Sequence, residues 1–82
     1  MRILDTVNQG PVRRIHIYLT PGEAAKLRHG LDRLLRDPEA TETERVVADD
    51  ASRDLSVSIV TLAKLHEVER YTDAERRMFA EP

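Results

Sequence analysis

The chain contains no cysteine and no tryptophan, and its aromatic residues are one phenylalanine and two tyrosines among 82 residues. The lack of cysteine excludes disulfide bonds and thiolate metal sites and agrees with a reducing compartment, so we expect a cytoplasmic protein. No run of about 18 apolar residues is available for a membrane-spanning helix, and the N-terminus lacks the basic-then-apolar order of a secretory signal. No glycine-rich loop of the kind that binds phosphate groups is present.

Length and apolar content predict one small domain with a modest core. Leu, Ile, Val and Phe make up 21 of the 82 residues, which is enough for a folded chain. A domain of this size buries only about 60% of its unfolded surface, so we expect a homodimer to supplement its stability. Residues 1–82 should form a single α+β domain, with residues 1–10 as an extra strand or a flexible segment and 72–82 as a terminal helix or tail.

Residues 12–38 are expected to form a strand that leads directly into a helix. In the strand, Ile15, Ile17 and Leu19 alternate with polar residues, which is the period of a strand with one buried face. The sequence Thr20-Pro21-Gly22-Glu23 then has the form of a capping box with proline at the first helical position. The apolar residues of the helix recur at three- and four-residue steps before Asp37-Pro38 ends it: Ala24, Leu27, Leu31 and Leu34.

A hairpin and further helix should follow. The β-prone run 46–48 precedes a turn over residues 49–54, after which Leu55, Val57 and Ile59 alternate with serines. From residue 60 onward the apolar spacing becomes helical, and residues 72–75 form a second capping-box match. The fold class is therefore α+β: a small, mainly antiparallel sheet of three or four strands in the order (β)βαββα, with one main helix packed on one sheet face.

Two polar surfaces are candidate partner-binding sites. If the apolar strand residues face the helix, the opposite sheet face presents Arg14, His16 and Tyr18 together with Ser56 and Ser58, and Arg and Tyr are enriched in binding hot spots. An acidic edge that could cap a basic active site, such as that of a nuclease, consists of Glu39, Glu42, Glu44, Asp49, Asp50 and Asp54. Both surfaces also fit simple solvated faces, and the sequence leaves that interpretation open.

Metal and catalytic patterns are incomplete. Asp50, Ser52 and Asp54 match the first three ligand positions of a calcium loop, but Leu55 stands where glycine is needed and Thr61 where a bidentate glutamate is needed. The three histidines have no ligand spacing between them, and no serine lies in a nucleophile-elbow setting. We therefore expect no metal, no cofactor and no enzymatic activity.

The chain resembles a type of small bacterial and phage protein. The run IYLTPGEAAKLRHGLDRLLRDPEA, followed later by DLSVSIV, is similar to proteins that open with LTPxEAxxLxxxLxxLLxDPE, and the similarity covers roughly residues 15–60. No activity is established for that type, so no site residue is carried over. The resemblance implies a freestanding small protein of the kind found among immunity proteins, antitoxins and phage-encoded inhibitors.

Residues 12–36 also resemble the first half of a ribbon-helix-helix repressor, in which a dimeric two-stranded ribbon reads base edges in the major groove. Those repressors continue into a second helix, whereas residues 41–60 are acidic and hairpin-like here, and the net charge of −2 opposes phosphate binding. We expect a non-enzymatic module that binds a protein partner. The alternative is a ribbon-type nucleic-acid-binding regulator that uses residues 12–19.

Overall fold

The computed structural model describes residues 1–80, without the side chain of Val68, and the chain forms two compact units. Unit 1 contains Met1–Ile17 and the residues from His66 onward, and unit 2 contains Tyr18–Leu65. The predicted α+β class with one main helix is confirmed. Among the described helices, none is long and apolar enough to cross a membrane.

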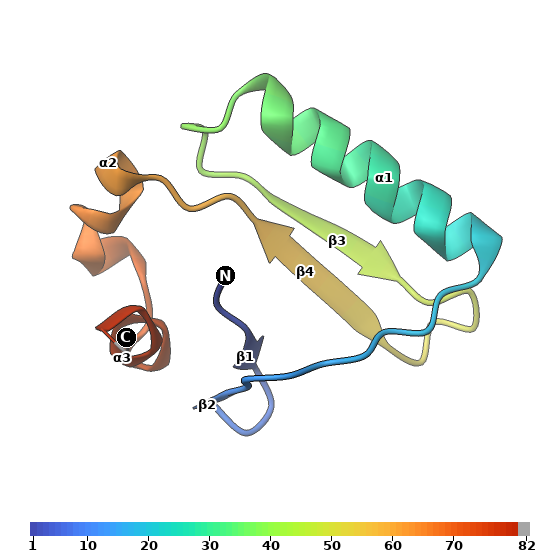
Figure 1. The fold of residues 1–82 in the computed structure, drawn as a ribbon, viewed down its shortest axis with the longest axis horizontal. Coiled ribbons are helices and arrows are strands. Elements are labelled where there is room, and N and C mark those ends of the chain that lie inside the picture. The colour runs from blue at the N-terminus through green and yellow to red at the C-terminus, as the bar shows by residue number, and fades with distance from the viewer. Residues whose placement is uncertain (81–82) are drawn as a thin grey trace. The chain divides into compact units, whose positions relative to one another are not determined.

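Unit 2 is a helix packed against a β-hairpin (Figure 1). Its elements are α1 (Pro21–Arg36), β3 (Thr43–Val47), β4 (Asp54–Ser58) and the short helix α2 (Leu62–Leu65). β3 and β4 pair antiparallel, with Glu44 opposite Val57 and Val46 opposite Leu55, and α1 packs mainly against β3. The predicted helix and the predicted hairpin are therefore both present, but the first strand begins at Thr43 and not at residue 46, and Asp54 belongs to β4 and not to the turn.

The capping box starts α1 as predicted. Thr20 lies in the β region, its Oγ1 accepts the N–H of Glu23 at 3.1 Å, and its own N–H donates to Glu23 Oε1 at 2.8 Å. Pro21 occupies the first helical position, where its missing N–H costs nothing. The helix ends at Arg36 because Asp37 precedes Pro38 and cannot continue in the α conformation.

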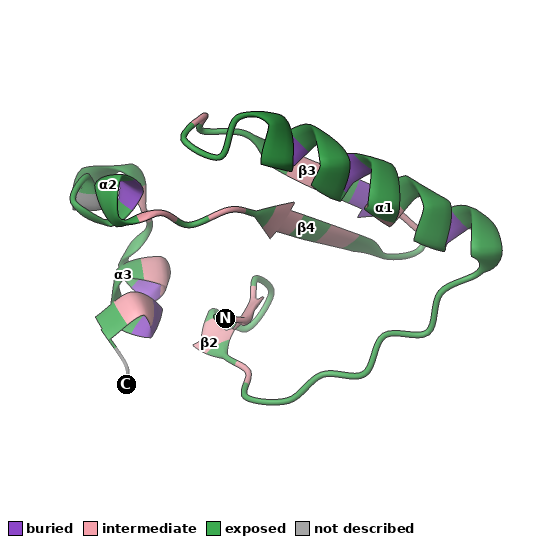
Figure 2. Ribbon diagram, turned by 45° about the horizontal axis from the view of Figure 1, so that its top comes forward, coloured by how far each residue is buried: buried purple, intermediate pink, exposed green. Residues whose placement is uncertain are grey.

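The core of unit 2 is small. Leu34 and Val46 are its buried apolar side chains, and Leu27 and Leu55 are half-buried. The buried residues of α1 lie on the side of the helix that faces β3, as the purple positions in Figure 2 show. Among the described residues, no large side chain is less than 2% exposed, so this unit has little apolar burial to stabilise it.

Gly30 lies where α1 approaches β3 most closely. A Cβ atom on Gly30 would meet Cβ of Glu44 at 3.2 Å, which is tighter than an ordinary van der Waals contact. For alanine, the gain of about 1 kcal/mol in helix propensity would be offset by this contact. We expect Gly30→Ile to lower the free energy of unfolding by about 1–3 kcal/mol, measured by urea denaturation. An unchanged midpoint would mean that the helix and β3 are farther apart than the structure indicates.

Unit 1 combines a short N-terminal hairpin with the C-terminal helix. Its elements are β1 (Leu4–Asp5), β2 (Gly10–Pro11), the 3-10 turn η1 (Val68–Arg70) and α3 (Asp73–Ala80). The turn between β1 and β2 is held by Asp5, whose side chain accepts the N–H groups of Val7 at 3.0 Å and Asn8 at 3.2 Å. These bonds lower the pKa of Asp5, with the Asn8 backbone N–H as the largest cause.

The second capping box is confirmed at α3. Thr72 donates its N–H to Glu75 Oε1 at 2.9 Å, and Glu75 donates its N–H to Thr72 Oγ1 at 3.2 Å. Ala74 and Met78 are buried, and α3 packs against β2. The sequence predicts the terminal helix over residues 72–82. Its described part is α3, which ends at Ala80, and the last two residues of the prediction, Glu81 and Pro82, lie outside the described residues.

The prediction of one sheet with three or four strands is wrong in the number of strands that pair. The described residues form two sheets of two strands each, and residues 12–19 belong to neither sheet. Pro11 has no N–H to donate, and the β1–β2 pairing stops after the bond from Val12 N–H to the Ile3 carbonyl at 2.8 Å. The alternation in residues 12–19 favours a strand, but a strand also needs a neighbour. We refer to Val12–Leu19 as the linking segment.

Candidate functional site

The N-terminus of α1 is bound to the turn between β3 and β4. Asp49 donates its N–H to Glu23 Oε2 at 2.8 Å, and Thr20 Oγ1 donates to Asp49 Oδ2 at 2.7 Å. Lys26 adds an ion pair, with Nζ 3.8 Å from Asp49 Oδ1. Thr20, Glu23 and Asp49 therefore form one cluster, here called the cap cluster, which fixes the helix start relative to the hairpin.

Glu23 is the centre of the cap cluster. Its side chain is only 8% exposed although it carries a charge. The N–H of Thr20, and after it the N–H of Asp49, hold the pKa of Glu23 below its ordinary value of 4.5, because both bonds favour the carboxylate. Both carboxylate oxygens of Glu23 therefore accept hydrogen bonds from its own chain, and the residue joins the start of α1 to the β3–β4 turn.

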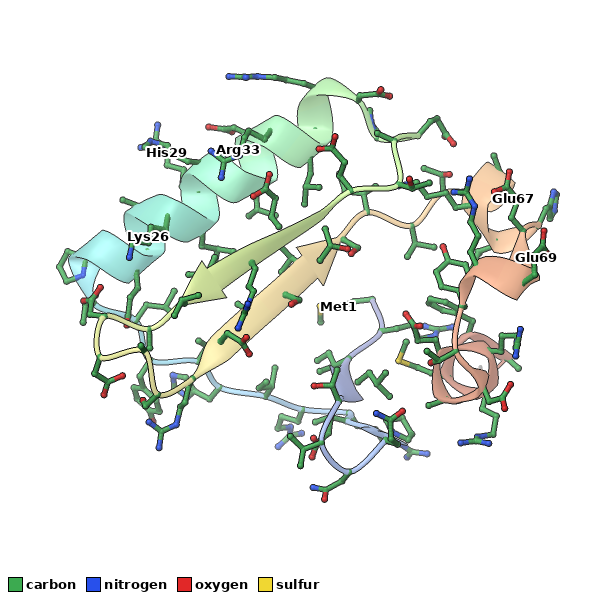
Figure 3. The ribbon with its side chains drawn as sticks, turned by 180° about the vertical axis from the view of Figure 1, so that it is seen from behind. Met1, Lys26, His29, Arg33, Glu67 and Glu69 are labelled. Atoms are coloured by element: carbon green, nitrogen blue, oxygen red, sulfur yellow. The ribbon has the colours of Figure 1, made fainter. Side chains whose placement is uncertain are left out.

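Arg33 and Glu44 form a two-pronged ion pair between α1 and β3. Arg33 Nε donates to Glu44 Oε1 at 2.8 Å, and Nη2 donates to Oε2 at 3.0 Å. The hydrogen bonds from Arg33 lower the pKa of Glu44, and those same bonds raise the pKa of Arg33. Figure 3 shows Arg33 beside His29 and Lys26 on one flank of α1. Glu44, predicted as a partner-binding residue, is thus engaged within unit 2.

The pair gives a testable pH dependence. Because the folded pKa of Glu44 lies below 4.5, its contribution is fully present above that value and is lost as the pH falls through the folded pKa. We expect the free energy of unfolding to be level between about pH 7 and 5.5 and to decrease below about pH 4.5. Urea denaturation across this range measures the slope.

Arg33→Gln should make the slope of that pH profile shallower, because Glu44 then loses the bonds that lower its pKa. Arg36→Gln removes the same charge from an exposed position of the same helix and should leave the slope unchanged. Equal slopes for both variants would show that the Arg33–Glu44 pair contributes nothing to the acid sensitivity.

The remaining acidic residues do not form one surface. Asp50 accepts the hydroxyl of Ser52 at 2.6 Å and its N–H at 3.0 Å, and these bonds lower the pKa of Asp50. Asp54 pairs with Arg45 across the hairpin, and Glu39 accepts the hydroxyl of Thr61 at 2.8 Å. Glu42 is exposed between α1 and β3. Most of these carboxylates already bind groups of their own chain.

Strand alternation further divides the acidic edge. Glu44 lies on the sheet face that packs against α1, as its contact with Gly30 shows. Asp54 precedes Leu55, whose side chain points to that same face. Because successive side chains of a strand point to opposite faces, Asp54 lies on the other face of the sheet. Asp49 and Asp50 lie in the connecting turn. The structure therefore brings together Asp49 and Asp50, but it separates Glu44 from Asp54.

The hairpin has the expected polar face. Ser56 and Ser58 are exposed on the side of β4 opposite to Leu55 and Val57, and Thr43 Oγ1 lies 2.7 Å from Ser58 Oγ across the strands. The predicted companions of these serines belong to no strand, so the prediction that they share a sheet face with Ser56 and Ser58 is wrong: Arg14, His16 and Tyr18. All three of those side chains are exposed.

The linking segment exposes its apolar residues as well. Ile15 is 51% exposed, Ile17 42% and Leu19 39%, although their spacing is that of a buried strand face. On α1, Leu31 is 41% and Leu35 64% exposed. Sequence reasoning placed Ile15, Ile17, Leu19 and Leu31 on buried faces and made no prediction for Leu35, so exposed apolar surface is the property it missed.

Lys64 is a further residue that sequence reasoning missed. It is 7% exposed, and its Nζ donates to the carbonyl of Ile59 at 2.8 Å. Its position in α2 gave no signal for burial, because lysine is seldom buried. Because its ammonium group binds a backbone carbonyl, Lys64 has a structural role: it connects α2 to the segment that follows β4.

Within residues 1–80, no three or more His, Asp or Glu side chains are grouped closely enough to hold a metal ion. No family model matches the chain, and comparisons with curated proteins and with solved structures give no match. The function must therefore be inferred from the chemistry and exposure of these surfaces.

Proposed function

We propose that this protein is a non-enzymatic interaction module that acts by binding another protein, in the manner of immunity proteins, antitoxins or phage-encoded inhibitors. One observation supports this most strongly: the linking segment exposes Ile15, Ile17 and Leu19 in strand alternation without belonging to a sheet. Contiguous exposed apolar side chains mark interaction sites more often than solvated surface.

The linking segment is suited to strand addition. In this mode an extended peptide pairs with a sheet edge of its partner, the main chain supplies affinity and alternate side chains supply specificity. Ile15, Ile17 and Leu19 would enter the apolar side of the interface. Arg14, His16 and Tyr18 would lie on its other side, where Arg and Tyr commonly contribute large shares of the binding energy.

The acidic edge has a smaller role in this proposal. Glu42 and Asp50 are exposed and carry negative charge, which would speed association with a basic partner. Asp49 and Glu44 are paired with Lys26 and Arg33 within unit 2, and these positive charges reduce the attraction that the two carboxylates exert on a basic partner. We therefore assign affinity to the linking segment and electrostatic guidance to the acidic edge.

The proposal is tested with Ile17→Asp. The tagged protein is used to isolate its partner from cell extract, the partner is purified, and its dissociation constant is measured for each variant. We expect Ile17→Asp to weaken binding at least about tenfold, because it buries a charge in the apolar side of the interface. Val7→Asp changes a residue that is 88% exposed in the β1–β2 turn and is expected to bind like the wild type.

Circular dichroism must show equal helix content in both variants. If Ile17→Asp binds its partner as tightly as Val7→Asp, the linking segment is not the binding surface.

The second candidate is a ribbon-type regulator that binds nucleic acid through residues 12–19. Arg13 and Arg14 favour it, because both are exposed and the linking segment contains no acidic residue. Against it, α1 is followed by the β3–β4 hairpin, where a ribbon-helix-helix protein has a second helix. Binding to duplex DNA that weakens as salt is added, and that is lost in Arg14→Ala, would favour this function over the first.

A further inference from the structure

One edge of β4 is available to pair with another strand. The β3–β4 sheet has two strands, so each has one side without a strand neighbour in the described structure. Proteins usually block such edges with charged residues or proline; β4 has a single charged residue, Asp54 at its start, and its remaining residues Leu55–Ser58 include no charge and no proline. β3 differs, because Glu44 and Arg45 stand in its centre. The edge of β4 is therefore the more receptive of the two.

The apolar face beside this edge is incompletely covered. Leu55 and Val57 point to the α1 side of the sheet but remain half-exposed. On α1, Leu31 and Leu35 are also exposed, one turn apart on the same flank. A third strand with apolar residues at alternate positions would extend the face under α1 and cover these side chains.

The geometry points to strand exchange between two copies of this chain: the linking segment of each copy pairs antiparallel with β4 of the other. This inference rests on the proposed binding role of the linking segment and names a second copy as its occupant. One register places the three alternating apolar residues of the linking segment opposite apolar residues of β4 or its extension: Leu19 with Leu55, Ile17 with Val57, and Ile15 with Ile59. In that register Tyr18 lies opposite Ser56 and His16 opposite Ser58.

The apolar pattern and symmetry both favour this partner. The alternation of Ile15, Ile17 and Leu19 matches that of Leu55, Val57 and Ile59 residue by residue. In the same register Arg14 lies opposite Val60 and Arg13 opposite Thr61, beyond the end of β4 and away from Asp54, so no like charges meet across the paired strands. Reciprocal exchange also makes a closed two-fold dimer, in which both linking segments and both β4 edges are used, so a third copy cannot add through the same contact.

Cross-linking tests the exchange directly, because the chain has no cysteine of its own. We would combine Tyr18→Cys and Ser56→Cys in one chain and treat it with a short bifunctional thiol reagent. The expected product is a covalent dimer on a denaturing gel. Each single variant should stay monomeric on the same gel, because the register places Tyr18 opposite Ser56 and places neither residue opposite its own copy. A link within one chain, or no link in the double variant, would overturn the inference.

Molar mass gives an independent measurement that does not depend on the introduced cysteines. Light scattering of the wild type should give twice the chain mass of 9.4 kDa, and Ile17→Asp should give the monomer mass. Val7→Asp should remain dimeric. A monomeric wild type that still binds a foreign protein through Ile17 would overturn strand exchange and leave the proposed function intact. A dimer with no foreign partner would support exchange and remove the proposed function.

Discussion

Leu34→Ala is expected to be the most destabilising single change in unit 2. Leu34 is 5% exposed and lies in the small core between α1 and β3. Truncating a buried leucine costs about 2–5 kcal/mol, while a domain of this size has a total stability near the lower end of about 5–15 kcal/mol. Urea denaturation should therefore give a much lower midpoint, and far-ultraviolet circular dichroism at 25 °C should show a loss of helix that approaches about half when the cost lies at the upper end of this range.

Leu62→Ala is the matched control for this prediction. It makes the same substitution in unit 2 at a side chain that is 69% exposed, and such changes usually fall within about 0.5 kcal/mol of the wild type. If Leu34→Ala and Leu62→Ala unfold at the same urea concentration, the core of unit 2 does not lie between α1 and β3.

Glu23→Ala is expected to be the second most damaging change. It leaves two backbone donors without their acceptor, the N–H of Thr20 and the N–H of Asp49. The loss should exceed that of Thr20→Ala, which removes a helix cap worth about 1 kcal/mol together with the exposed hydrogen bond from Thr20 Oγ1 to Asp49. Glu23→Gln should fall between these variants, because an amide offers one acceptor oxygen. Urea denaturation of the three variants at neutral pH gives the ranking.

The second capping box provides a control of the same kind. Glu75 bonds to Thr72 just as Glu23 bonds to Thr20, but in α3 no distant N–H is recorded on the Glu75 carboxylate within residues 1–80. Glu75→Ala should therefore cost only a cap. Equal losses for Glu23→Ala and Glu75→Ala would show that the bond from Asp49 adds no stability.

Local patterns were sufficient to predict α1, α3 and the β3–β4 hairpin. A capping box joins two residues that are three positions apart, such as Thr20 and Glu23. A proline likewise restricts the backbone conformation only of itself and of the residue before it. The alternation of Leu55 and Val57 with serines likewise gave the polar face of β4. In each case the deciding atoms are close together along the sequence, so the composition of a short window contains the information.

Contacts between distant residues could not be read in this way. Nothing in the window around Glu23 indicates that its second oxygen binds Asp49, and nothing around Glu44 indicates that it faces Arg33. The linking segment has strand alternation, but whether Ile15 and Ile17 find a neighbouring strand depends on residues far along the chain or in another molecule. The candidate site was therefore predicted as residue types and not as a surface.

Unit 1 combines two segments that are far apart in the sequence, so we expect it to fold after unit 2. Met1–Ile17 belongs with residues from His66 onward, and β2 contacts α3, so this unit joins the two ends of the described chain. Its formation must close a long loop, at an entropic cost that grows with loop length, whereas α1 and the β3–β4 hairpin are continuous in sequence. During synthesis, the N-terminal hairpin therefore waits for residues 73–80, and the middle of the chain is the first part able to fold.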